Sequence, residues 1–109
     1  MSQKPGIFQQ EETPIDREIA GALANLMPED WDAIRLVLRR LPFDPSGLAH
    51  SIQSPEGHTE VVEPDDELYA ATLKLEQLFA RHGKQFKSAR YELEYNDEGD
   101  LDYEVRFEY

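Results

Sequence analysis

The sequence contains no cysteine, so disulfide bonds and thiolate chemistry are excluded. No apolar run approaches the roughly 18 residues of a membrane span, so no membrane partner is expected. The first twelve residues lack the apolar stretch of a secretory signal, which makes a cytoplasmic protein the default expectation. Basic residues are also scarce, because 11 lysines and arginines stand against 23 acids, a net charge of −12. Direct nucleic-acid binding is therefore not expected, since it needs a basic footprint.

The acidic excess is concentrated at the C-terminus. Residues 91–109 carry eight acids and one base, more than half of the net charge of the chain. Such a concentration favours a basic partner, or serves solubility alone. The 109 residues, 39% of them hydrophobic, suit one folded domain with a modest core.

The first expected helix begins at Thr13, a suitable N-cap, with Pro14 at the first helical position and Pro28 as its end. Residues 1–12 are predicted to be a flexible tail, with docking of Phe8 on the domain as the minority alternative, and residues 13–109 to be the domain. One apolar stripe supports the helix: Ile15, Ile19, Ala22, Leu23 and Leu26. Trp31 is expected to pack beneath this helix.

Period-two alternation predicts a strand over residues 31–41, followed by a turn over 42–47 and weaker strands over 48–54 and 58–63. A second helix is expected from Pro64 to His82, because acids open it, bases close it and Gly83 follows. Its buried stripe comprises Leu68, Ala71, Leu75, Leu78 and Phe79. With two strands at the C-terminus, the pattern predicts an α+β fold: one antiparallel sheet of about five strands, with two helices on one face, in the order helix, three strands, helix, two strands.

The last 19 residues predict a hairpin with a definite register. Burying the apolar residues of both strands on one face requires Tyr95 to pair with Leu101, which leaves a three-residue loop, Asp97-Glu98-Gly99. This loop type favours positive φ at its third position, where Gly99 stands.

The same register places like charges opposite one another on the outer face. The opposed pairs are Glu94 with Asp102, Glu92 with Glu104, and Arg90 with Arg106. Each such pair costs a few tenths of a kcal/mol when exposed. Two interpretations stay open. The face is either simply solvated, with charge compensation from a neighbouring strand such as the one carrying Arg35 and Arg39, or a preformed surface for a cationic partner.

No catalytic or metal-binding motif is found. His50, His58 and His82 are far apart and share no metal-ligand spacing. The acidic run around Gly99 fails the calcium-loop pattern, because Val105 stands where a bidentate glutamate is needed. No phosphate loop, dinucleotide fingerprint or nucleophile elbow occurs, so no catalytic residue, metal or cofactor is predicted. The basic stretch 81–90 is interpreted as a helix cap that balances local acids, with a secondary basic patch as the alternative.

The helix that ends in "LMPEDW" (Leu26 to Trp31), the second helix ending in "LEQLFARHG" and the final hairpin around "YELEYNDEG" and "LDYEVRFEY" resemble the YezG-like family of immunity proteins. The likeness covers residues 13–109 and is weakest over 42–63. It implies a small acidic antitoxin that binds one secreted toxin domain, often a nuclease of a polymorphic or contact-dependent growth inhibition system.

The leading hypothesis is therefore a non-enzymatic inhibitor of a basic toxin, expected to be a nuclease, with RNase, DNase and other activities left open. A monomer in a heterodimer with that toxin is expected, and pairing of sheet edges into an oligomer stays the alternative. Acids on a rigid strand surface can occupy a basic cleft and speed the encounter. The candidate toxin-binding residues are Glu92, Glu94, Asp97, Glu98, Asp100, Asp102 and Glu104. The alternatives are a small acidic adaptor that binds a basic partner without a toxin and, third, an enzyme that uses two of the carboxylates.

Overall fold

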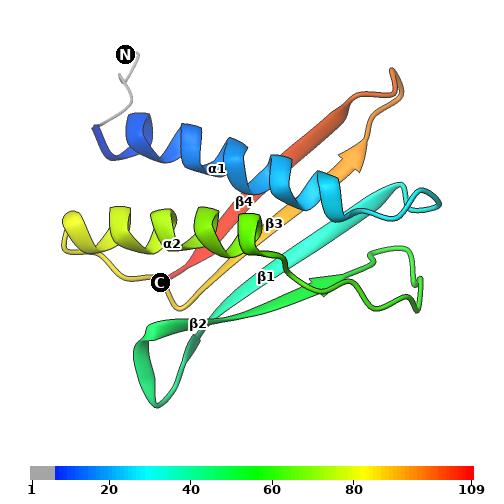
Figure 1. Ribbon diagram of the computed structural model, residues 1–109. Coiled ribbons are helices and arrows are strands. Elements are labelled where there is room, and N and C mark those ends of the chain that lie inside the picture. The colour runs from blue at the N-terminus through cyan, green and yellow to red at the C-terminus, as the bar shows by residue number, and fades with distance from the viewer. Residues whose placement is uncertain (1–6) are drawn as a thin grey trace.

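Two helices and four strands make up the computed structural model, which describes residues 7–109 (Figure 1). The elements are α1 (Ile7–Leu26), β1 (Ala33–Leu41), β2 (Asp44–Gln53), α2 (Asp66–Arg81), β3 (Ser88–Tyr95) and β4 (Leu101–Glu108). The strands form one antiparallel sheet in the order β2-β1-β3-β4, and both helices cover the same face of it (Figure 1). The predicted α+β class with a single antiparallel sheet is confirmed.

The prediction of about five strands is wrong for the described residues, because the segment 58–63 forms no strand. Ser54 Oγ accepts hydrogen bonds from the backbone N–H groups of Glu56 and His58, which turns the chain away from the sheet after β2. The His58 ring then stacks on the Trp31 ring with centroids 5.4 Å apart, and Val62 packs against the core. The segment therefore runs as an extended connection toward α2, and its strand propensity finds no ladder partner. β2 also begins at residue 44, inside the predicted turn.

The first helix begins at Ile7 rather than at Thr13, so the predicted boundary of the flexible tail is wrong for residues 7–12. Thr13 is no N-cap, because its hydroxyl donates to the carbonyl of Gln9, one turn earlier in the helix, at 3.0 Å. Pro14 lies inside the helix, where it removes one backbone hydrogen bond. Residues 1–6 of the predicted tail lie outside the described residues.

Tertiary contacts explain why the helix continues toward the N-terminus despite the proline. Phe8 packs edge-on against Phe79 of α2 with ring centroids 4.9 Å apart, and the Lys84 ammonium lies 4.4 Å from the centre of the Phe8 ring. Glu11 forms an ion pair of 3.1 Å with Arg81. The docking of Phe8, which was only the minority alternative in the sequence prediction, is therefore present.

The second helix follows its sequence signals closely. Asp65 caps it by accepting a hydrogen bond from the N–H of Leu68 at 2.9 Å, and Gly83 follows the last turn with a φ of +65°. All five residues of its predicted apolar stripe are buried. Together with α1 they cover the inner face of β1 and β3, where Ile34, Leu36 and Tyr91 are inaccessible to solvent. Trp31 is buried in the same core, as predicted.

The C-terminal hairpin has the predicted register throughout. Tyr95 pairs with Leu101, and the ladder continues to Ser88 opposite Glu108. The N–H of Asn96 donates to the carbonyl of Asp100 at 2.8 Å, which closes the three-residue loop 97–99, and Gly99 adopts a φ of +83°. The three predicted like-charge pairs are therefore cross-strand neighbours.

Candidate functional site

The face of the sheet that no helix covers is the open face (Figure 1). Side chains alternate along each strand, so the residues between the buried core positions of β1 and β3 point toward it. The register places Arg35 beside Glu92, Val37 beside Arg90, and Arg39 beside Ser88 across β1 and β3. The acids of β3 therefore lie toward the Arg35 end of the open face, and Arg39 and Arg90 lie toward its other end.

The acidic half of the open face consists of Glu92, Glu94, Asp102 and Glu104 from β3 and β4. Two of these carboxylates have a counterion: Arg35 contacts Glu92 with Nε 2.7 Å from Oε1, and Arg106 contacts Glu104 at 2.8 Å. The predicted compensation from a neighbouring strand is thus present for Glu92, through Arg35. The Asn96 amide donates weakly to Asp102 at 3.3 Å.

Glu94 and Asp102 remain the least compensated like-charge pair of this half. Both are exposed and directly opposed, and no ion pair reaches either from the part of the chain that the structure describes. They line a hollow of about 400 Å³ together with Arg35, Glu92 and Glu104. A cation that enters this hollow meets Glu94 and Asp102, in addition to the two carboxylates that are already paired with arginines.

The hairpin tip consists of Asp97, Glu98 and Asp100, all of them exposed. The side-chain oxygen of Asn96 accepts hydrogen bonds from the N–H groups of Glu98 at 2.9 Å and Asp100 at 3.0 Å. The tip is therefore fixed relative to the acidic half, and the structure places all seven predicted site residues on one hairpin. The side-chain arrangement gives a preformed anionic strip rather than scattered acids.

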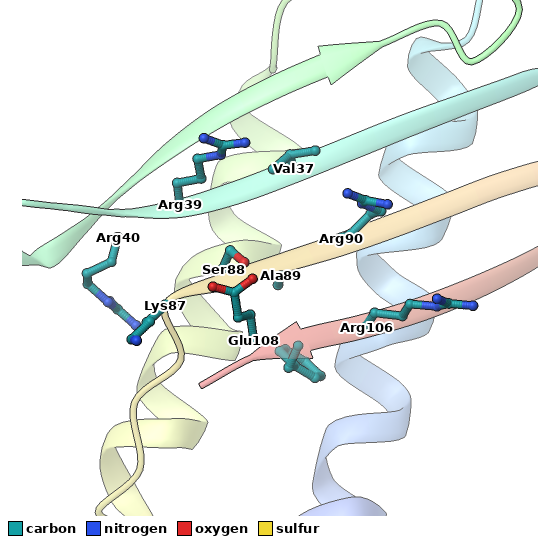
Figure 2. A pocket seen from close by; sticks show the side chains of 10 residues that line it. Val37, Arg39, Arg40, Lys87, Ser88, Ala89, Arg90, Arg106 and Glu108 are labelled. Carbon is teal, nitrogen blue, oxygen red and sulfur yellow. The ribbon is translucent and has the colours of Figure 1, made fainter.

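A second hollow, of about 620 Å³, lies at the other end of the open face and was not predicted as a site. We call it the arginine hollow (Figure 2). Its lining residues are Val37, Arg39, Arg40, Lys87, Ser88, Ala89, Arg90, Arg106, Phe107 and Glu108. The sequence indicated part of it, since the stretch 81–90 had a basic patch as its alternative interpretation. The missing signal was the register between β1 and β3, which brings Arg39 next to that stretch.

A third group of ionisable residues lies between α1 and β3, with Asp16 and Tyr91 buried and Glu12 half-buried. The Tyr91 hydroxyl donates to Asp16 Oδ1 at 2.6 Å, and burial together with the charge of Asp16 raises the pKa of Tyr91. Burial, followed by a hydrogen bond and repulsion from Asp16, raises the pKa of Glu12 from its ordinary 4.5 to about 8. Glu12 lines neither hollow of the open face. Its raised pKa is explained by packing and by the neighbouring carboxyl, since structural networks also perturb pKa values.

Residues 7–109 contain neither a cluster of metal-ligating side chains nor a helix able to span a membrane. No group of three or more histidine, aspartate or glutamate side chains there is arranged to hold a metal ion. Neither helix combines the length and apolarity that a membrane span requires.

Comparison of the sequence with models of known protein families and with curated proteins gives no match. The resemblance to the YezG-like immunity proteins therefore stays a prediction, and the arguments about function depend on the geometry of the open face.

Proposed function

We propose that this chain is an immunity protein that binds a basic toxin domain through the acidic half of its open face and the hairpin tip. A nuclease is the favoured class of toxin. The observation that carries the proposal is the Glu94–Asp102 pair, which is directly opposed on the β3–β4 ladder and has no ion pair among the described residues. Like charges in this position destabilise the sheet, so a cationic partner gains by relieving the repulsion as well as by its own ion pairs.

The surrounding geometry supports a protein partner rather than a small cation. The acidic half and the tip form one continuous strip along β3 and β4, and Tyr103 at its margin is 39% exposed. Partly exposed tyrosines beside charged residues are frequent anchors in protein interfaces. A nuclease cleft that grips a phosphate backbone presents the complementary basic surface.

The test is a charge reversal, Glu94→Lys combined with Asp102→Lys. The binding partner to test is the basic C-terminal domain of a secreted protein, if one is encoded immediately upstream of this chain. Each reversal replaces an attraction to the basic partner with a repulsion, and we expect it to cost at least about 1.4 kcal/mol of binding free energy. Because about 1.4 kcal/mol corresponds to a tenfold loss, the two reversals together should weaken binding at least 100-fold. The matched control is Glu60→Lys with Glu63→Lys, two exposed acids of the segment between β2 and α2. Affinity is measured by calorimetry, and protection by growth of cells that express the toxin domain.

Equal binding by the hairpin variant and the control would contradict the proposed site. A chain that binds a basic protein partner through the same strip, with no toxin domain encoded nearby, would be the acidic adaptor of the alternative hypothesis.

A further inference from the structure

We propose that the arginine hollow is a binding site for a small polyphosphate anion, recognised through its phosphate chain. The first observation is the composition of the hollow. Five of the 11 lysines and arginines of the chain line it, against one of the 23 acids, Glu108. In a chain with twice as many acids as bases, this local inversion of charge makes one hollow strongly cationic.

The second observation is that three of these cations have no counterion. No carboxylate of residues 7–109 forms an ion pair with Arg39, Lys87 or Arg90. One step along the same two strands, Arg35 is paired with Glu92 at 2.7 Å. The sheet therefore supplies counterions to Arg35 and Arg106, through Glu92 and Glu104, whereas its described residues supply none to Arg39 or Arg90.

The ladder also holds these cations close together. Arg90 lies directly opposite Arg106, an arrangement that costs stability unless an anion lies between or beside them. Val37 lies beside Arg90 across β1 and β3 and is only 8% exposed, so it forms part of the floor below the guanidinium groups. Arg106 extends along β4 to Glu104, and Arg40 is held by Glu76 and by the carbonyl of Phe86. The free donors are thus those of Arg39, Lys87 and Arg90.

The donor chemistry suits a chain of phosphate groups. Guanidinium groups present paired N–H donors that match phosphate oxygens, and the Ser88 hydroxyl adds another donor at the centre of the lining. The hollow is wide and shallow, and its apolar lining is limited to Val37, Ala89 and Phe107, so it offers no enclosed slot for a nucleobase. A ligand is therefore held by its charged chain, and several charges are needed to engage donors on two strands.

The charge of the whole chain limits the size of the ligand. A net charge of −12 repels a long polyanion such as RNA, whose flanking phosphates would lie over the acidic half. A compact polyphosphate can stay within the hollow, whose lining holds five basic residues and one acid. Glu108, opposite Ser88, is the one carboxylate that opposes the ligand (Figure 2).

The test titrates the full chain with inorganic tripolyphosphate and, in parallel, with ATP, both without divalent cations, by calorimetry in 150 mM salt. Arg90→Ala and Arg39→Ala should each weaken binding at least fivefold, because each removes donors that have no other partner. Arg17→Ala, an exposed arginine on α1 away from the hollow, is the matched control and should bind as the parent does. Glu108→Gln should tighten binding two- to fivefold, a gain that a folding defect cannot imitate.

Equal affinities for tripolyphosphate and ATP would assign recognition to the phosphate chain alone, and a tighter ATP complex would add contacts to the nucleoside. Either result supports the site. Absence of saturable binding for both probes, or equal loss in Arg90→Ala and Arg17→Ala, would overturn it. So would binding of an RNA oligonucleotide by a chain that ignores tripolyphosphate. The experiment contains no toxin, and its outcome is independent of the function proposed above.

Discussion

Tyr91→Phe should destabilise the protein by about 2 kcal/mol. The Tyr91 side chain is inaccessible to solvent, and its hydroxyl donates to Asp16, which is 6% exposed, at 2.6 Å. Hydrogen bonds from a neutral donor to a carboxylate contribute roughly 1.5–3 kcal/mol. Phenylalanine keeps the ring and its packing, so the loss reports on the hydroxyl and on the carboxylate that it leaves without this donor.

Urea unfolding at neutral pH measures the effect, with an expected fall in midpoint at unchanged m-value and a drop in Tm of roughly 8 °C at about 4 °C per kcal/mol. Tyr95→Phe is the control, because Tyr95 is 47% exposed and should lose less than about 0.5 kcal/mol. A double-mutant cycle with Asp16→Asn isolates the coupling between the two side chains. A loss for Tyr91→Phe no larger than that of the control would refute the view that the hydrogen bond from Tyr91 to Asp16 stabilises the packing of α1 on the sheet.

Two further changes test the pKa of Glu12 and the hairpin loop. Because the folded-state pKa of Glu12 is raised from 4.5 to about 8, its stability contribution is complete below pH 4.5 and is lost as pH rises toward 8. The free energy of unfolding of Glu12→Gln should therefore rise relative to that of the parent as the pH increases from 4.5 to 8. The rise should be smaller than the limiting ~1.4 kcal/mol per pH unit, because the carboxyl is partly solvated. Urea unfolding at pH 5, 6.5 and 8 measures the difference, and a constant difference would reject the prediction. Gly99→Ala should cost about 1 kcal/mol by thermal unfolding, because φ is +83° while a Cβ there meets no atom within 4 Å; an unchanged Tm would argue against the loop conformation.

Local signals in the sequence predicted the elements whose determinants are themselves local. The C-terminal hairpin and α2 carry their turn glycine, cap and apolar period within a few residues, and both form as expected. The start of α1 could not be read in this way, because Phe8 is ordered by the distant Phe79 and outweighs the proline at position 14. Residues 58–63 had strand-like composition, but a strand needs a partner, and their packing against Trp31 depends on the folded core.

In the candidate site, too, contacts within one hairpin were predictable from the sequence, whereas contacts between distant strands were not. The pairing of Glu94 with Asp102 follows from the hairpin alone and was predictable. The partnership of Arg35 with Glu92, and the gathering of Arg39 near Arg90, depend on which strand lies beside β3 and in what register. No local pattern encodes that choice, because the strands concerned are separated by β2 and α2. The arginine hollow was therefore visible only as an ambiguous basic stretch.

The strand order also has a consequence for how the molecule folds. The two hairpins join residues close in sequence, whereas β1 and β3 join residues that are roughly fifty to sixty positions apart, so we expect the pairing of β1 with β3 to carry the largest loop-closure entropy cost. Until it forms, Glu92 and Glu104 face each other without Arg35. Docking of β1 supplies the missing countercharge at the same time as it buries Leu36 beside Tyr91. The rate of folding should therefore depend on salt concentration, because salt screens the attraction between Arg35 and Glu92 that accompanies the pairing of β1 with β3.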